Sequence, residues 1–329
     1  MKRRSILSAA ALAATAGLAV HQSQASHVPY RRPRRSHVAI LRCDRYERTP
    51  EAVERGLQLV RPAVQGKRVL LKPNLVEYSP AAPINTHPML IAAVIDALYR
   101  LGAATVIVAE GPGHVRDTDL LLHESGLEAQ LDLLKRASFV DLNFDAVTRV
   151  APGTGLIQLK ELWLPTTVRS ADVVISMPKI KTHHWAGVTL SLKNSFGILP
   201  GGVYGWPKNV LHWQGIDNSI VELAVSVPIR FVIADGVEAM EGNGPLHGPM
   251  RHLGCLVFAD DPVAADATCC RLMGIDPRRV RHLQMASPLG NLDAPHIEQR
   301  GEAIGDVLQR FELLPQFTHL RGDVNRESL

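Results

Sequence analysis

Short apolar runs alternate with longer amphipathic stretches along most of this chain. The apolar runs lie between turn residues and predict buried strands at 37–43, 69–71, 105–109, 172–177, 229–234 and 253–258. The intervening stretches predict helices at 50–64, 88–101, 118–136 (interrupted by Gly126), 217–227 and 262–273. Such alternation predicts an α/β fold with a mainly parallel sheet covered by helices and ligand-binding loops at the carboxyl ends of the strands. The less regular segment 141–165 is where we expect an antiparallel excursion.

The domain organisation that follows has four parts. Residues 1–25 are expected to be an export signal, and residues 26–36 an Arg/Pro-rich leader. Residues 37–290 are expected to form the α/β domain, either as one body or as two lobes that meet near residues 165–170. Residues 291–329 are weakly patterned and are expected to be a C-terminal extension.

The export signal is predicted from a charged start, an apolar run and a small-x-small cleavage site that ends at Ala25. The Arg3-Arg4 pair is similar to the twin-arginine signal, and an ordinary Sec signal with a chance arginine pair is the alternative. No other stretch is long and apolar enough to cross a bilayer. We therefore expect a soluble, periplasmic or otherwise extracytoplasmic protein after cleavage, with one of these two export machineries as its partner.

The formal net charge of +4 arises from the leader. Positions 1–35 hold seven Lys and Arg residues and no acid, and the remainder has 29 basic and 32 acidic residues. A nucleic-acid-binding domain would have a basic face on its folded body. The composition therefore gives no support to nucleic acid as a partner.

The cysteines are too few and too scattered for a cluster-binding protein. The chain has four, Cys43, Cys255, Cys269 and Cys270, without any C-x-x-C pair, so no iron–sulfur cluster is expected. Cys269 and Cys270 lie in a helical pattern and are expected to be buried small residues. A Cys43–Cys255 disulfide is compatible with an oxidising compartment but cannot be assigned from spacing.

Polar segments follow the predicted strands at their carboxyl ends. They are Lys72-Pro73-Asn74, the segment from Glu110 to His114, the segment 179–194, and a Gly-rich segment that begins at Asp235. In a parallel sheet these segments all lie at one edge, where α/β proteins bind ligands. The segment 183–201 is the richest, with adjacent histidines, a Trp and Lys193-Asn194. The sequence therefore predicts one site formed by these segments.

Lysines dominate this predicted site. Lys179 and Lys181 lie on the same side of an extended chain, which suits a carboxylate or phosphate ligand. The alternative is that one of them pairs with a structural acid such as Glu110. Lys193 is a candidate anion ligand, covalent attachment point or general base. Asp235 ends an apolar strand and is a candidate for a cation or a ligand hydroxyl.

Several segments together resemble the domain of unknown function 362 (DUF362) family, over roughly residues 37–285. They are K-P-N-L, A-D-V-V-I-S-M-P-K-I-K-T-H, G-V-T-L-S-L-K-N-S-F-G-I-L-P-G, D-G-V-E-A-M-E-G-N-G-P and D-D-P-V-A-A-D-A. The family offers no settled reaction. Some members carry ferredoxin-like clusters, whose cysteines this chain lacks.

A more distant resemblance is to the nickel-dependent lactate racemases. The spacing of His183, Ala186-Gly187 and Lys193 is similar to one of their loops, and a Pro-Gly and a later histidine, His212, follow as they do there. Gly113-His114 resembles another of their loops. The resemblance implies a nickel-pincer nucleotide tethered to Lys193, with His212 as the metal ligand. It also implies His183 and His114 as the acid/base pair.

We therefore expect an exported metal- or cofactor-dependent enzyme, isomerase/racemase-like or an oxidoreductase, that transfers a proton or hydride on a small, hydroxy-acid-like anion. The expected catalytic residues are His183, His114 and Lys193, with His212 as a metal ligand. The expected binding residues are Lys72, Asn74, Glu110, Lys179, Lys181, Asn194 and Asp235. The alternative is a periplasmic anion-binding protein without catalysis, in which the histidines only hydrogen-bond the anion. Taken by itself, His212 is better interpreted as a buried structural histidine. A hydrolase is disfavoured, since neither G-x-S-x-G nor H-E-x-x-H is present.

Overall fold

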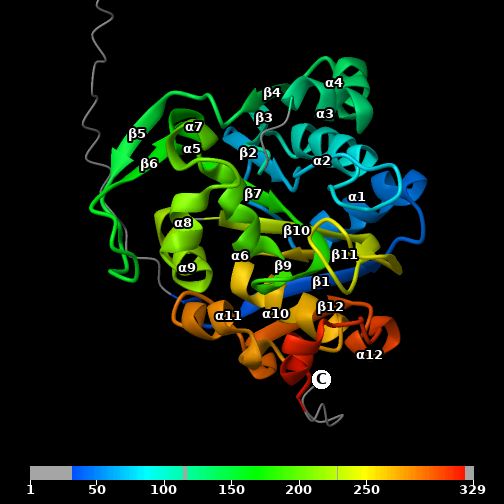
Figure 1. The fold of residues 1–329 in the computed structure, drawn as a ribbon. Helices are drawn as coiled ribbons and strands as arrows, with labels where there is room; N and C mark the ends of the chain where they lie inside the picture. Colours follow the sequence, from blue (N-terminus) through cyan, green and yellow to red (C-terminus); the bar gives the residue numbers. More distant parts are fainter. Residues whose placement is uncertain (1–31, 114–116, 228, 323–329) are drawn as a thin grey trace, which may run out of the picture.

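A computed structural model describes residues 32–113, 117–227 and 229–322 of the chain. Their main feature is a ten-stranded sheet (Figure 1). Eight of the strands follow one another in the order β12 (Ile297–Gly301), β1 (Ser36–Arg42), β11 (Met250–Ala259), β10 (Ile229–Met240), β7 (Val173–Met177), β2 (Arg68–Pro73), β3 (Thr105–Glu110) and β4 (Ser138–Asp141). The other two, β8 (Lys179–His183) and β9 (Gly187–Thr189), join the sheet through β10. Along this order only β11 runs antiparallel to its neighbours. The predicted mainly parallel α/β fold is confirmed.

Helices cover both faces of the sheet (Figure 1). One face is covered by α1 (Thr49–Leu59), α2 (Pro88–Arg100), α3 (Thr118–Glu124) and α4 (Leu127–Leu134). The other is covered by α6 (Ser191–Asn194), α8 (Asn209–Trp213), α9 (Ile216–Ser226), α10 (Pro262–Leu272), α11 (Arg281–Ala286) and α12 (Ile304–Val307). Burial on both faces is why the central strands read as continuous apolar runs.

Strand β1 shows how one sequence serves both layers. Val38 and Ile40 pack into the core on one face, whereas Ala39 and Leu41 pack into the core on the other. Successive side chains of a strand point to opposite faces, so each strand contributes to both cores.

Local chemistry sets the helix boundaries. The Asp261 carboxylate caps α10 by accepting the backbone N–H of Val263 at 2.8 Å, and Pro262 occupies the first turn, as predicted. Helix α1 was expected to reach residue 64 but ends at Leu59, because Pro62 disfavours the helical conformation at the residue before it. The expected interruption at Gly126 is confirmed, since its φ of +76° separates α3 from α4.

The segment 179–194 was expected to be a loop, and this expectation is wrong. Residues Lys179–His183 form β8, which pairs with β10 and makes a hairpin with β9 (Gly187–Thr189). This pairing exists because β10 is longer than predicted and continues as far as Met240, still paired with β11. For the same reason Asp235 lies inside a strand rather than at its end.

The middle of the chain contains the expected antiparallel excursion. Strands β5 (Val147–Val150) and β6 (Leu162–Pro165) pair antiparallel outside the main sheet, and α5 (Thr166–Ser170) and α7 (Gly201–Tyr204) lie nearby (Figure 1). The main sheet takes strands from both sides of residues 165–170. It also takes β12 from the segment that was expected to be a C-terminal extension.

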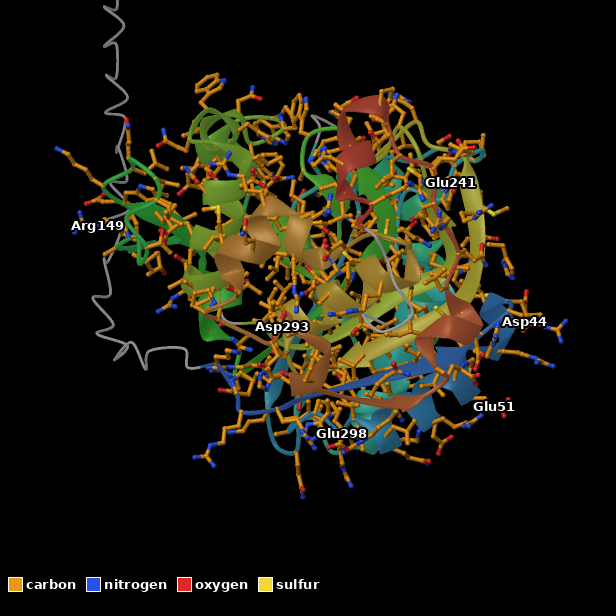
Figure 2. The ribbon with its side chains drawn as sticks, turned by 90° about the horizontal axis from the view of Figure 1, so that it is seen from below. Asp44, Glu51, Arg149, Glu241, Asp293 and Glu298 are labelled. Atoms are coloured by element: carbon orange, nitrogen blue, oxygen red, sulfur yellow. The ribbon has the colours of Figure 1, made fainter. Side chains whose placement is uncertain are left out.

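Exposed charge is concentrated outside the two cores. Figure 2 shows Asp44, Glu51 and Arg149 extending from the outside of the molecule, and all three are exposed. The cysteines, in contrast, are all buried free thiols, so the Cys43–Cys255 disulfide is not formed. No described helix combines the length and apolar character that crossing a membrane requires. The expected export signal lies outside the described residues.

Candidate functional site

A cavity of about 330 Å³ lies at the carboxyl ends of β2 and β3, against the β8–β9 hairpin and the helices that follow it. Its size is at the lower end of the range for small-molecule sites. Apolar and aromatic side chains form much of its wall, among them Leu75, Val76, Trp185, Phe196 and Leu246. Its polar groups are mostly basic: Lys181, Lys193, Lys208, His183, His184, His212 and His247.

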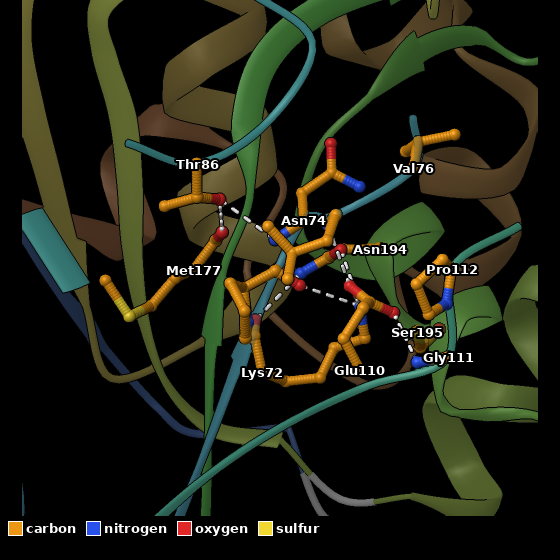
Figure 3. Close-up of polar contacts among 12 residues, drawn as sticks. Lys72, Asn74, Val76, Thr86, Glu110, Gly111, Pro112, Met177, Asn194 and Ser195 are labelled. Carbon is orange, nitrogen blue, oxygen red and sulfur yellow. Dashed lines mark hydrogen bonds and ion pairs between the residues drawn. The ribbon is translucent and has the colours of Figure 1, made fainter. Parts of the chain in front are cut away.

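Below this cavity, Lys72 and Glu110 form a buried ion pair (Figure 3). The Lys72 amine lies 2.5 Å from Glu110 Oε2 and also donates to Asn194 Oδ1 at 2.9 Å. Glu110 accepts the backbone N–H groups of Leu75 and Gly111 as well. Burial lowers the pKa of Lys72, and the Glu110 carboxylate opposes that shift. The pair therefore joins the ends of β2 and β3 and has its charge neutralised internally.

Gly197 is the residue that lets another segment approach this pair. A Cβ at this position would lie 1.9 Å from Glu110 Oε1 and 2.7 Å from the Lys72 amine. The Gly197 carbonyl also accepts the N–H of Gly111 at 2.7 Å. Only glycine permits this approach of backbone to a buried ion pair.

Lys179 and Asp235 form a second buried ion pair, with 2.7 Å between the amine and Oδ2. The Tyr46 hydroxyl donates to Asp235 Oδ1 at 3.1 Å, and the backbone N–H of His87 donates to Oδ2 at 3.0 Å. Neither charged residue lines the cavity. The structure therefore separates Lys179 and Asp235 from the other predicted site residues and gives each a partner in the other.

Lys181 lies two residues along the same strand but has a different environment. Its amine donates to the carbonyls of Ile84 and Pro245, at 2.7 and 3.3 Å, and it lines the cavity. Among the described residues no carboxylate forms an ion pair with it. Burial, followed by the charges of Lys179 and Lys193, lowers its pKa well below the usual value.

Lys193 lies on α6 and reaches the same cavity. Its amine lies 3.9 Å from the centroid of the Phe196 ring, and no described carboxylate pairs with it. Burial, followed by the positive charge of Lys72, lowers the pKa of Lys193 to about 7. A substantial fraction of the amine is therefore uncharged near neutral pH.

Asp266 fixes the short helix that carries Lys193. Its carboxylate oxygens accept the N–H groups of Ser191 and Leu192 at 2.7 and 2.9 Å. Both are donors of the first helical turn, which have no partner within the helix. The α10 helix thus determines where Lys193 stands, although Asp266 itself does not line the cavity.

His183 and His212 line the cavity in opposite hydrogen-bonding states. The Nδ1 atom of His183 accepts the N–H groups of Trp185 and Ala186, so Nε2 carries the proton of the neutral ring. The Nδ1 atom of His212 faces the Lys208 carbonyl at 3.1 Å, so this ring donates there and keeps a lone pair on Nε2. Burial lowers the pKa of His183 well below 6.5 and that of His212 to about 4.

Two other lining residues carry polar atoms that lack a hydrogen-bond partner within the described part of the chain. They are Asn74 Oδ1 and Thr189 Oγ1, and both side chains are almost fully buried. An orphaned buried polar atom costs free energy, so such atoms at a cavity wall point to a bound ligand or water. The backbone of Asn74 is held by Thr86 (Figure 3).

The structure thus brings together Asn74, Glu110, Lys181, His183, Lys193, Asn194 and His212, with Lys72 just below, and leaves Lys179 and Asp235 apart. His114 lies outside the described residues. Sequence reasoning missed Lys208, which is buried, lines the cavity and donates to Asn143 Oδ1. Burial lowers the pKa of Lys208 to about 8. Its φ of +69° is unusual for a side-chain-bearing residue and had no signal in the sequence.

A metal site made by the chain alone does not form in the described residues. They contain no group of three or more His, Cys, Asp and Glu side chains placed to hold a metal ion. The lone pair on His212 Nε2 provides one ligand, and its Nδ1–H bonded to a carbonyl is an arrangement typical of ligating histidines. A metal here would therefore need most of its ligands from a cofactor of its own.

Residues 69–271 match the family described as "Domain of unknown function (DUF362)", and the chain belongs to this family. It is also similar to a thylakoid-associated protein of Synechocystis sp., with 28% identity over 68% of each chain.

Two solved structures are similar in part. One is the lactate racemase apoprotein from Thermoanaerobacterium thermosaccharolyticum (13% identity, TM-score 0.42), which matches over 72% of this chain and 56% of that one. The other is a protein from Thermotoga maritima (11% identity, TM-score 0.37), with 64% and 54% covered. The chain matches just over half the length of each of these structures.

Proposed function

We propose that this protein is an enzyme that binds a small carboxylate or phosphate anion in the cavity and transfers a proton at a neighbouring carbon. The observation that carries the proposal is that two amines, those of Lys181 and Lys193, line the cavity without a carboxylate partner among the described residues. A buried cation is costly unless it is paired. An anionic ligand supplies the missing partner.

The proton transfer uses the two histidine states. His212 has an unprotonated Nε2 that accepts a proton, and its pKa of about 4 keeps it neutral at physiological pH. His183 presents an N–H that donates a hydrogen bond to a ligand oxygen, because its Nδ1 is held by backbone donors. This assignment changes the expected role of His183 from a general base to a donor. The uncharged fraction of Lys193 provides a second base.

Calorimetric titration of the full chain with lactate and with inorganic phosphate tests the binding step. We expect Lys181→Met to weaken binding at least tenfold, because hydrogen bonds to charged groups contribute about 1.5–3 kcal/mol. Lys160→Met removes the same charge from an exposed position and is expected to leave the affinity unchanged. Absence of binding to the unaltered protein would overturn the proposal.

Proton transfer is tested separately from binding. Loss of deuterium from C2 of labelled lactate, followed by nuclear magnetic resonance, is expected for the unaltered protein and not for His212→Leu. Binding without any exchange, across a panel of small hydroxy acids, supports the alternative of an anion-binding protein without catalysis.

A tethered nickel cofactor remains a proposal of its own. Lys193 and His212 line the same cavity, so one can attach such a group and the other can ligate its metal. When bound, the cofactor would supply an electrophilic metal centre. Metal analysis and intact mass of the protein from its native host test this: stoichiometric nickel and extra mass at Lys193 would support it, and an unmodified, metal-free chain contradicts it.

We also propose export, which rests on the sequence of residues 1–25 alone. The mass of the protein recovered from outside the cytoplasmic membrane is expected to correspond to a chain that begins after Ala25. Changing Arg3 and Arg4 to Lys is expected to block export if the route is twin-arginine and to leave it intact if the route is Sec. A full-length protein retained in the cytoplasm would contradict both.

A further inference from the structure

The Lys193 amine has surroundings that differ from those of an ordinary binding lysine. It stands over the Phe196 ring at the wall of a largely apolar cavity, where the charge of Lys72 acts on it. Burial and the charge of Lys72 favour the uncharged amine, while the Glu110 carboxylate opposes this shift of its pKa. A desolvated lysine next to another cation is an arrangement that produces a nucleophile toward carbonyl carbons.

The groups around Lys193 fit a ligand that carries both a carboxylate and a carbonyl. Lys181, held by two backbone carbonyls, is placed as a hydrogen-bond donor for the carboxylate. The His183 N–H is a donor suited to a carbonyl oxygen. Thr189 Oγ1, which has no hydrogen-bond partner among the described residues, can donate to the same ligand.

We propose that Lys193 forms an imine with the carbonyl carbon of a small 2-oxo acid. The inference rests on the proposed function, since it uses the same cavity and the same anion-binding lysine. The remaining wall, with Leu75, Trp185 and Phe196, suits an acid with a short apolar substituent.

The reaction is a condensation that needs no oxidant or reductant. The Lys193 nitrogen lone pair forms a bond to the carbonyl carbon, and the carbonyl π electrons move to oxygen, which takes up a proton. The nitrogen of the resulting carbinolamine loses a proton, and the hydroxyl leaves as water when it is protonated, giving C=N. The protonated imine makes the hydrogens on C3 of the acid more acidic, so a neighbouring base such as His212 can remove one of them.

Reductive trapping tests the imine directly. The full-length protein is incubated with pyruvate and sodium cyanoborohydride, and its intact mass and peptide map are measured. We expect one reduced pyruvate adduct, located at Lys193. Lys193→Arg keeps a positive charge but cannot form an imine, so no adduct is expected, whereas Lys160→Arg is expected to behave like the unaltered protein.

The pH dependence provides a second measurement. Trapping requires the uncharged amine, so its initial rate is expected to rise with pH through about 7 and then level off. An exposed lysine would continue to gain reactivity up to about 10.4. Adducts spread over surface lysines, or a rate that rises throughout this range, would overturn the proposal.

Lactate distinguishes failure of the imine from failure of the proposed function, because it differs from pyruvate by a hydroxyl in place of the carbonyl. Calorimetric binding of lactate and pyruvate without trapping overturns the imine and leaves anion binding standing. Absence of both binding and trapping overturns both proposals. A Lys193 that already carries extra mass before pyruvate is added also overturns the imine.

Discussion

Two sets of lysines on neighbouring segments have opposite environments. Lys72 and Lys179 each lie within 2.7 Å of a buried carboxylate, and each ion pair is completed by further hydrogen bonds. Lys181 and Lys193 line the cavity without such a partner among the described residues. A buried charge that is neutralised within the protein serves the fold, whereas one that is not neutralised stabilises the protein only when a ligand arrives.

The comparison matters most for Lys181, because it shares a strand with Lys179. The alternation of side chains places both on the same side of β8, yet Lys179 pairs with Asp235, whereas Lys181 donates to backbone carbonyls. Residue type and spacing alone therefore do not separate a structural lysine from a binding lysine. What separates them is a partner from a distant part of the sequence, here Asp235, which pairs with Lys179.

The largest effect on stability is expected from breaking one of the ion pairs formed by Lys72 and Lys179. Lys179→Met should lower the free energy of unfolding by about 3–5 kcal/mol, because it leaves the Asp235 carboxylate buried without its counter-charge. Urea unfolding measures this, with Lys160→Met as the exposed control. A loss below about 1 kcal/mol would show that the pair is not structural.

A smaller effect on stability is expected at Asp266, which positions the helix that carries Lys193. Asp266→Asn replaces one carboxylate oxygen with an N–H group that faces the backbone donors of α6, so we expect a loss of about 1–3 kcal/mol in urea unfolding. Asp119→Asn is an exposed control on α3. Equal stability of the two variants would contradict the role of Asp266.

The pH dependence of stability tests whether the Lys193 amine lacks a counter-charge. Lys193 has a pKa of about 7 in the folded protein and 10.5 as its ordinary value, so the unfolded chain binds more protons between these limits. The free energy of unfolding should therefore rise with pH across this window, by at most about 1.4 kcal/mol per pH unit. Lys193→Met removes this contribution, and the difference between the two proteins should grow with pH. Parallel curves would be inconsistent with a desolvated amine.

The smallest effect is expected for an ion pair at the surface. Arg149 and Glu161 lie 2.9 Å apart across the β5–β6 pair, with both side chains exposed. Arg149→Ala should cost less than about 1 kcal/mol in urea unfolding, because solvent screens such pairs. A loss comparable to that of Lys179→Met would remove the distinction between exposed and buried pairs.

The sequence was sufficient for six of the ten strands of the sheet but not for the partners of its polar residues. Apolar runs located the main strands, because both faces of a parallel sheet are buried and leave a strong local signal. The same runs placed Lys72, Glu110 and Lys193 near one edge. The length of β10 was missed because its second half, from Asp235 to Met240, contains Gly and acids that are typical of loops.

The site chemistry depends on contacts between distant segments. Three contacts show this, because each joins residues that are far apart in the chain and no local pattern predicts it. They are the pairing of Lys179 with Asp235, the hydrogen bonds from α6 to Asp266, and the approach of Gly197 to Glu110. The same holds for Lys208, whose burial against Asn143 had no periodic signal. The tautomers of His183 and His212 follow only from backbone groups that the fold brings to them.

Strand β1 pairs on one side with β11 and on the other with β12, which are among the last strands of the chain. The pairing partners of this early strand are therefore synthesised only when the chain is nearly complete, and its backbone hydrogen bonds cannot form before then. Such long-range closure slows folding and leaves an open strand edge in any chain that stops early. A chain truncated before residue 297 would lack β12 and leave one edge of β1 unpaired. Complete and truncated chains would therefore differ in whether this edge is exposed.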